Sequence, residues 1–136
     1  MKKIMLMILP VMMLFLFQGC KKDEVSSSTL LITFTSHPQG GTQVATVSSG
    51  FDGIVVGNAK AIEVTAEWWW EDANHQNSMI KKTEQITFSS NNNTSKSTAY
   101  SASSGYILLN YYWVKLKWTD DSGVHTLESG KAFCQQ

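Results

Sequence analysis

From Leu30 onward, apolar and polar residues alternate along the chain, and the clearest run extends from Ala61 to Glu71. Successive side chains of a β-strand point to opposite sides, so this alternation predicts a strand with one apolar face. The apolar positions are Ile62, Val64, Ala66, Trp68 and Trp70. The other face carries Glu63, Thr65, Glu67, Trp69 and Glu71, and Trp69 is the exception to its polar character.

A second strong strand is predicted from Ile107 to Thr119. Its inner face would consist of Leu108, Tyr112, Val114, Leu116 and Trp118, and its outer face of Leu109, Tyr111, Trp113, Lys115 and Lys117. The sequence Asp120-Asp121-Ser122-Gly123 then predicts a hairpin turn, because Gly supplies the positive φ that such turns need. Val124 to Leu127 is expected to pair back, and Lys131 to Cys134 to form the last strand.

The remaining segments give weaker patterns. Leu30 to Phe34 predicts a first strand and Gln43 to Val47 a short one, whereas the Ser- and Gly-containing segment Ser48 to Gly53 predicts a break. Met79 to Phe88 predicts the partner of the Ala61–Glu71 strand, with Ile80, Ile86 and Phe88 facing inward. Ser89 to Gly105 predicts a loop with a weak strand from Lys96 to Ala102, in which Tyr100 is the buried anchor.

About seven short strands with a turn signal roughly every 8 to 12 residues predict an all-β fold, an antiparallel β-sandwich. An eight-stranded barrel is the alternative. A Trp on a middle strand, together with the Tyr-x-Val-x-Leu-x-Trp strand that begins at Tyr112, resembles immunoglobulin-like and fibronectin type III-like modules. The resemblance implies the general sandwich architecture and no particular activity.

The N-terminus predicts a processed targeting segment. Lys2 and Lys3 precede the apolar run Ile4 to Phe17, which has the length of a signal-peptide core and is short for a membrane-spanning helix. The run ends in Leu16-Phe17-Gln18-Gly19-Cys20, which resembles the lipobox of bacterial lipoproteins. We therefore expect a signal peptide at 1–19, a lipidated Cys20 with a flexible tether at 20–29, and the β-sandwich at 30–136. An ordinary signal peptide that happens to stop near a cysteine is the alternative.

The residues after Cys20 indicate a cellular location. Lys22-Asp23-Glu24 resembles the export signal of Bacteroidota surface lipoproteins, in which a Lys and two acidic residues closely follow the acylated cysteine. The resemblance implies attachment to the outer membrane by acyl chains on Cys20, with the domain facing the cell exterior. Several acyl chains on one residue hold durably, whereas one chain holds only marginally.

Charge and cysteine content narrow the function classes. The chain has no Arg, and removal of Lys2 and Lys3 leaves nine Lys against eleven acidic residues, a balance of about −2. Nucleic-acid binding is not expected, because it requires a basic face. If the sulfur of Cys20 is in a thioether, Cys134 has no disulfide partner and is expected to be a free thiol.

No pattern of catalytic or metal-ligating residues is found. His37, His75 and His125 are scattered over two turns and a strand, without the close spacing of a zinc site. Asp120 and Asp121 are explained by the hairpin turn without calcium. Sequence motifs of nucleophile elbows, phosphate-binding loops and metalloproteases do not occur. We expect no cofactor, no metal and no enzymatic activity.

The candidate functional residues are aromatic. Trp69, Tyr111 and Trp113 fall on the charged faces of the two strong strands, and Trp69 and Trp113 would lie close together if those strands are adjacent. Glu67 and Glu71 would then lie near Lys115 and Lys117. One interpretation is an aromatic ladder that stabilises the sheet or lies beneath the Ser89–Gly105 loop. The other is an exposed patch that binds glycan or protein.

Two functions follow from these interpretations. The first is a non-catalytic binding or accessory module at the cell surface, which recognises a glycan or a protein through Trp69, Tyr111 and Trp113. The second is a structural or assembly component of the cell envelope, which packs against other chains through its strand edges or through the same patch.

Overall fold

A computed structural model describes residues 27–90, 92–102 and 110–135, which form an all-β protein. Cys20 and the signal Lys22, Asp23 and Glu24 lie outside these residues. None of the described residues belongs to a helix long and apolar enough to cross a membrane. The strands are β1 (Thr29–Ser36), β2 (Gly41–Thr42), β3 (Thr46–Val56), β4 (Ala61–Asp72), β5 (Ser78–Ser89), β6 (Thr94–Ser101), β7 (Asn110–Asp120), β8 (Gly123–Glu128) and β9 (Ala132–Gln135).

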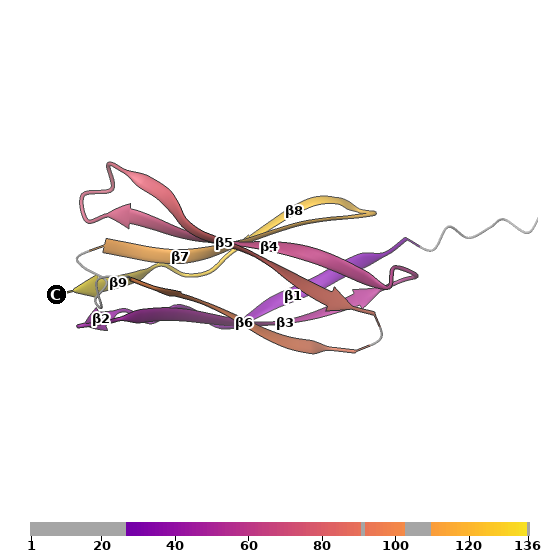
Figure 1. The fold of residues 1–136 in the computed structure, drawn as a ribbon. Helices are drawn as coiled ribbons and strands as arrows, with labels where there is room; N and C mark the ends of the chain where they lie inside the picture. Colours follow the sequence, from indigo (N-terminus) through magenta and orange to yellow (C-terminus); the bar gives the residue numbers. More distant parts are fainter. Residues whose placement is uncertain (1–26, 91, 103–109, 136) are drawn as a thin grey trace, which may run out of the picture.

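The strands form two sheets that face each other (Figure 1). The smaller sheet has the order β1-β3-β6, and the larger has the order β2-β9-β7-β4-β5, with β8 also paired to β7. The strand ladders are antiparallel except for the short parallel pair of β2 and β9. The predicted β-sandwich is therefore confirmed, and the barrel alternative is wrong because the strands divide between two separate sheets.

Strands β8 and β9 behave as one interrupted strand beside β7. β8 pairs with Lys115–Asp120 of β7 and β9 with Asn110–Tyr112, so they follow each other along the same side of β7. At the interruption, Ser129 N donates to the Val114 carbonyl at 2.9 Å, and Val114 N donates to Ser129 Oγ at 3.0 Å. With β8 and β9 counted once, the larger sheet has five strands and the smaller sheet has three.

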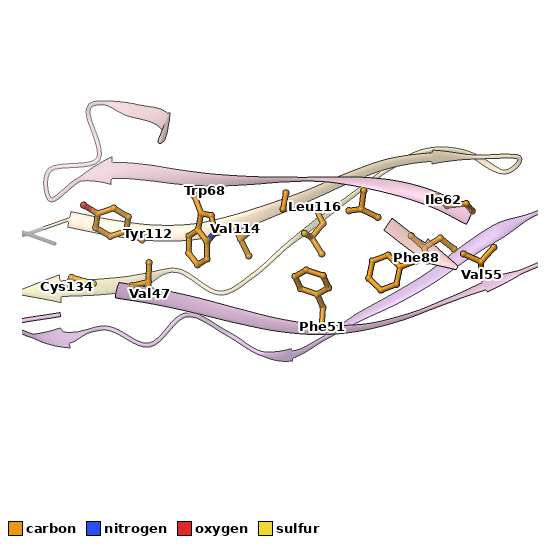
Figure 2. Packing of buried hydrophobic residues seen from close by; sticks show 13 residues of the cluster. Val47, Phe51, Val55, Ile62, Trp68, Phe88, Tyr112, Val114, Leu116 and Cys134 are labelled. Carbon is orange, nitrogen blue, oxygen red and sulfur yellow. The ribbon is translucent and has the colours of Figure 1, made fainter. Parts of the chain in front are cut away.

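The core lies between the sheets and includes most of the predicted inward residues (Figure 2). Trp68 is fully buried near the middle, where its Nε1 donates to Thr98 Oγ1 of β6 at 2.8 Å. This bond satisfies the one polar atom of the indole ring inside the core. The buried apolar residues that β4, β5 and β7 contribute to this core cluster are Ile62, Val64, Ala66, Trp68, Phe88, Tyr112, Val114 and Leu116.

The predicted break at Ser48–Gly53 is wrong, because this segment forms the middle of β3. Its inward positions continue the alternation of Val47, Phe51 and Val55 but include the small residues Ser49 and Gly53, which obscure the pattern. Position 53 requires glycine because the Phe88 ring packs directly against it. A Cβ at this position would lie 2.6 Å from Cδ1 of Phe88, and closer still to Cε1, so the ring occupies the space of the missing side chain.

Ile80 was predicted to face inward, and this prediction is wrong. The β4–β5 register shifts between Trp68 and Trp69, where Trp68 pairs with Lys82 but Trp69 pairs with Ile80. The extra residue, Lys81, is a β-bulge that reverses the alternation in β5. Ile80 therefore lies on the outer face beside Trp69, and 43% of it is exposed.

Strand boundaries differ modestly from prediction near the N-terminus. β1 begins at Thr29 and Ser28 is already buried, so the folded domain starts slightly before the predicted boundary between tether and sandwich. The short strand predicted at Gln43–Val47 is not formed as one unit, because Gln43 has a left-handed φ of 58° between β2 and β3. Tyr100 lies in the predicted weak strand, half-buried and stacked on Tyr112 with ring centroids 5.6 Å apart.

Substitution of Gly53 by Ala tests whether the close approach of the Phe88 ring requires a residue without a side chain at position 53. The added Cβ has to displace the Phe88 ring, so we expect Gly53→Ala to lower the free energy of unfolding by about 1 to 3 kcal/mol. Urea denaturation followed by tryptophan fluorescence measures the loss. Gly130→Ala is the control, since its nearest neighbour would be His37 Cβ at 3.9 Å. Equal stability of the two variants would contradict the packing explanation.

Candidate functional site

The outer face of the larger sheet brings Trp69 and Trp113 together. Trp69 of β4 pairs directly with Trp113 of β7, and residues opposite each other in an antiparallel pair share one side of the sheet. Their ring centroids are 6.0 Å apart and the ring planes lie 18° from parallel. The prediction that these two residues lie close together is confirmed.

Tyr111 lies on the same face, opposite Glu71 of β4. Its ring stacks on His75 from the β4–β5 turn at 4.7 Å and packs against Phe133 of β9 at 4.8 Å. Neither His75 nor Phe133 was predicted to lie on this face. Phe133 was detectable in principle, because it alternates with the buried residues Ala132 and Cys134.

Charged side chains surround the aromatic rings. Lys115 Nζ lies 4.9 Å from the centroid of the Trp69 ring, and Lys131 Nζ lies 4.2 Å from that of Trp113. Such positions allow cation–π attraction. Trp69 Nε1 donates to Glu67 Oε2 at 3.0 Å. The face is therefore one of aromatic rings enclosed by Lys and Glu rather than a bare apolar surface.

The predicted charge pairs are correct for Glu67 and incorrect for Glu71. Lys117 Nζ contacts Glu67 Oε1 at 2.9 Å, whereas Lys115 pairs with Glu128 of β8 at 2.7 Å. Glu71 is paired with Lys131 and with His75 instead. The hydrogen bond from Lys131 lowers the pKa of the Glu71 carboxyl, and the contact with His75 adds to this effect.

The predicted patch of three exposed rings, Trp69, Tyr111 and Trp113, is not fully exposed. Trp69 and Tyr111 are half-buried, but only 6% of Trp113 is exposed. Its Nε1 is buried and has no hydrogen-bond partner among the described residues. Trp69 of β4 and Lys131, which directly precedes β9, lie against the Trp113 ring and help to cover it.

The apolar surface continues from Trp69 onto the β4–β5 hairpin. Ile80 pairs with Trp69 on the outer side of the sheet, and Met79 pairs with Trp70 on the other side. Both residues of β5 are exposed, Ile80 by 43% and Met79 by 47%. The hairpin therefore presents apolar side chains on both of its faces.

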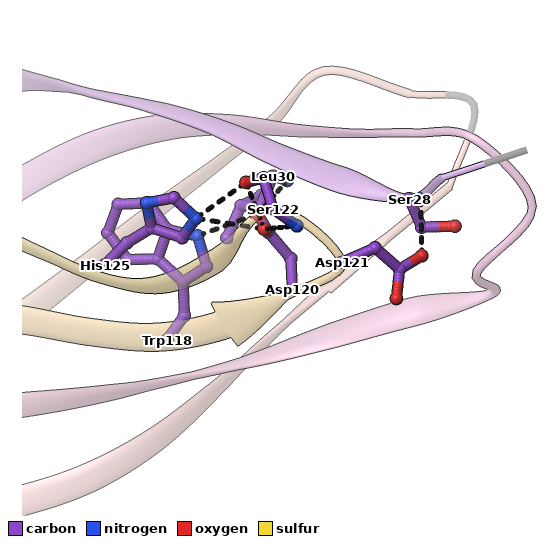
Figure 3. A network of polar contacts seen from close by, with 7 residues as sticks. All are labelled: Ser28, Leu30, Trp118, Asp120, Asp121, Ser122 and His125. Carbon is purple, nitrogen blue, oxygen red and sulfur yellow. Dashed lines mark hydrogen bonds and ion pairs between the residues drawn. The ribbon is translucent and has the colours of Figure 1, made fainter.

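A polar cluster occupies the opposite end of the molecule, at the β7–β8 turn (Figure 3). His125 Nε2 lies 2.8 Å from Ser122 Oγ and 2.9 Å from Asp120 Oδ1. A catalytic triad would use the two ring nitrogens separately, one for the Ser and one for the Asp. Here both contacts involve the same nitrogen, and Ser122 Oγ also donates directly to Asp120. This geometry suits a turn-stabilising network.

The same cluster holds the start of β1. Leu30 N donates to Asp120 Oδ2 at 3.0 Å, Ser28 N donates to Asp121 Oδ2 at 2.7 Å, and Asp121 N donates to the Ser28 carbonyl at 3.1 Å (Figure 3). Burial alone would raise the pKa of Asp120. The hydrogen bonds from Ser122, Leu30 N and His125 outweigh burial and hold that pKa well below its usual range.

Three further kinds of site come into consideration: an open groove, the cysteine thiol and a metal-binding cluster. An open groove of about 550 Å³ lies beside this cluster on the larger sheet, lined in part by Glu63, Thr65 and Lys117, and contains none of the predicted binding residues. Cys134 is buried and forms no disulfide within the described residues, and burial raises the pKa of its thiol. Within the described parts of the chain, no three His, Cys, Asp or Glu side chains gather as a metal site requires.

No family model and no curated protein matches the chain. Among solved structures it is similar to the β-glucosidase of Listeria innocua in complex with isofagomine, at 9% identity and a TM-score of 0.46, over 80% of this chain and 16% of that one. It is also similar to the β-glucosidase of Kluyveromyces marxianus (9% identity, TM-score 0.45, 78% and 15% covered) and to Spo0M, the sporulation control protein of Bacillus subtilis (8%, 0.41, 81% and 50%). The chain spans about a sixth of the glucosidases and half of Spo0M, and these likenesses concern the fold alone.

The low pKa of Asp120 predicts a specific acid sensitivity. Because the folded-state pKa lies below the unfolded value of about 3.9, the stabilisation is present above that value and is lost as pH falls through the folded pKa. Asp120→Asn should therefore lower the melting temperature at neutral pH, with the difference from the native chain shrinking below about pH 4. Thermal denaturation followed by circular dichroism across this pH range measures both effects.

Ser122→Ala provides an internal comparison, since it removes one hydrogen bond to Asp120 and leaves the carboxylate in place. We expect Ser122→Ala to lower the melting temperature at neutral pH by less than Asp120→Asn does. This decrease should also become smaller as the pH falls. A difference between Asp120→Asn and the native chain that stays constant down to acid pH would contradict the role of the ionised carboxylate.

Proposed function

We propose that the protein is a lipid-anchored, surface-exposed lipoprotein whose sandwich domain is a non-catalytic module for binding another protein. The anchor is proposed from the sequence: the apolar run, Cys20 and the Lys22-Asp23-Glu24 signal. The observation that carries the binding role is the exposed apolar surface of the β4–β5 hairpin, formed by Met79 and Ile80 beside Trp69 and Trp70.

The position of this hairpin supports such a role. The tether leaves the domain at the start of β1, and the β4–β5 turn lies at the far end of the sandwich (Figure 1). A module held to a membrane by its N-terminus would present this end outward. Apolar residues exposed beside a rim of charged residues are typical of protein interaction sites, where Trp and Tyr act as anchors.

A protein partner is better supported than a glycan. Stacking on a sugar requires the free face of an aromatic ring, and Trp113 is buried between Trp69 and Lys131. Tyr111 is similarly engaged, by His75 and Phe133. The unoccupied apolar groups are instead the aliphatic side chains of Met79 and Ile80, which suit contacts with another protein.

Assembly through strand edges has weaker support. β5 is one edge strand of the larger sheet, but it contains the bulge at Lys81 and a second lysine, Lys82. Bulges and lysines are features that discourage pairing of an edge strand with another chain. The edge of β5 is therefore poorly suited to extend the sheet, whereas its side chains remain available for contact.

The anchor is tested by Cys20→Ala. Without the acylated cysteine the mature chain should lose its membrane attachment, so it should move from the detergent phase to the aqueous phase in Triton X-114 partitioning. The native chain should incorporate labelled palmitate and the variant should not. Persistence of Cys20→Ala in the detergent phase would show that attachment does not depend on acylation of Cys20.

Surface display is tested separately by replacing Lys22, Asp23 and Glu24 together with Ala. The variant should remain lipidated but should become protected from protease added to intact cells. Digestion of the native chain and of this variant at the same rate would contradict a role of the three residues in export.

The binding surface is tested by photo-crosslinking on cells. A photoreactive amino acid at Ile80 should give a discrete protein adduct, and Trp69→Ala in the same chain should reduce its yield several-fold. The matched control is the same amino acid at Ser97, an exposed position on the smaller sheet. Equal adducts from both positions, or an adduct unaffected by Trp69→Ala, would count against the hairpin as the binding surface.

A further inference from the structure

We propose that the end of the sandwich from which the tether leaves rests on the lipid surface that holds Cys20, with Leu31, Val56 and Val124 as the apolar contact. This inference depends on the lipidation proposed above. It adds a second interaction surface, distinct from the β4–β5 hairpin, and specifies its partner as the hydrocarbon and headgroup boundary of a bilayer.

The point at which the tether leaves the domain is fixed by hydrogen bonds. Ser28 is buried, and its backbone exchanges hydrogen bonds with Asp121 in the β7–β8 turn. Its side chain accepts a hydrogen bond from Ala59 N at 2.7 Å, in the β3–β4 turn. Leu30 N is held by Asp120. The chain therefore enters the domain between two turns at one end, and a pull on the tether acts on that end.

The tether is short compared with the length of the domain. Eight Cα–Cα steps separate Cys20 from Ser28, which reach at most about 28 Å when fully extended. A flexible chain of this length has an average span of only about 16 Å. The longest strands, β4 and β5, have 12 residues and are therefore about 40 Å long. The tether holds one end of the domain near the bilayer and is too short to let the domain invert freely.

Three large exposed apolar side chains lie near the end from which the tether leaves. Val124 is 81% exposed at the beginning of β8, directly after the turn that binds Ser28. Val56 is 47% exposed and pairs with Thr29, the first residue of β1. Leu31 is 61% exposed and pairs with the half-buried Ile54. Leu31 and Val56 lie on the outer face of the smaller sheet and Val124 on that of the larger sheet, so apolar side chains are exposed on both sides of this end. The other large exposed apolar side chains of the described residues are Met79 and Ile80, in the remote hairpin.

Of the acidic side chains at this end, Glu63 is exposed in the groove beside Val124, whereas Asp120 and Asp121 are bound within the protein. Asp120 accepts hydrogen bonds from Ser122 and from Leu30 N, and Asp121 accepts one from Ser28 N, so both carboxylates are engaged within the protein. Lys60, in the adjacent β3–β4 turn, is exposed and is available to anionic headgroups. Because the tether keeps this surface close to the lipid, a weak apolar contact is sufficient to hold it there.

The experiment uses the full chain, processed and lipidated by its host and placed in vesicles of phosphatidylethanolamine and phosphatidylglycerol. A polarity-sensitive fluorophore is attached to Asn58→Cys in the β3–β4 turn or to Asn74→Cys in the β4–β5 turn, both exposed. The buried thiol of Cys134 is shielded from the reagent. We expect the label at position 58 to show blue-shifted emission and several-fold stronger quenching by spin-labelled lipid than the label at 74.

Two double variants of the chain labelled at position 58 identify the residues responsible. Leu31→Asn with Val124→Asn should return its emission toward that of the label at 74. Met79→Asn with Ile80→Asn removes the same number of exposed apolar side chains at the other end and should leave the emission unchanged. Because these side chains are exposed, the variants should keep the native circular dichroism spectrum.

The outcomes separate this inference from the proposed anchoring. A chain that fails to float with the vesicles overturns the lipid anchor and this contact with it. A chain that floats while the labels at 58 and 74 report the same aqueous environment overturns the contact alone. The contact is also overturned, and the anchor is not, if Leu31→Asn with Val124→Asn leaves the emission of the label at 58 unchanged in a chain that remains folded.

Discussion

The structure depends on the register between β4 and β7, the two central strands of the larger sheet. Trp69 faces Trp113 and Trp68 faces Val114, so one pairing determines both surfaces of the sheet. On the inner side, Trp68 and Val114 enter the core; on the outer side, Trp69 and Trp113 begin the aromatic ladder. A slip of one residue would exchange the two sides and expose the core residues. The fold and the candidate site are thus consequences of the same register.

Polar side chains close the sandwich along the sides that the apolar core leaves open. On the side of β5 and β6, Lys82 Nζ donates to the Ala99 carbonyl at 2.8 Å, and Thr98 connects Trp68 Nε1 with Glu84. At the β7–β8 turn, Asp120 and Asp121 join the larger sheet to β1 of the smaller one. Such bonds add directional constraints that burial of apolar area does not supply, because the hydrophobic effect is non-directional. They fix how the two sheets are aligned.

The sequence predicts the elements whose alternation uses large residues and misses those that use small ones. Trp68, Val114 and Leu116 identify their strands unambiguously, whereas β3 alternates Val and Phe with Ser49 and Gly53, which resemble a turn. Gly53 is small because Phe88, distant in sequence, fills its place. No local pattern contains that information.

The candidate site was predicted in part, for a related reason. Adjacent strong strands bring Trp69 and Trp113 together, and this follows from alternation alone. The burial of Trp113 cannot be predicted from this alternation, because it depends on Lys131. Lys131 precedes β9, and the pairing of β9 with β7 brings it to the site. The orientation of Ile80 likewise depends on a bulge that the sequence does not mark.

The two sides of the larger sheet differ in how readily they can be rearranged. The inner side is held by close packing, where removal of a large side chain typically costs about 2 to 5 kcal/mol. The outer side is held by contacts such as the Lys115–Glu128 pair and the position of Lys115 over Trp69. An exposed ion pair is worth about 0 to 1 kcal/mol and an exposed cation–π contact about 0.5 to 1 kcal/mol. A partner docking beside Trp69 can therefore displace the lysines at small cost, while the core beneath keeps the β4–β7 register and the ring positions that depend on it.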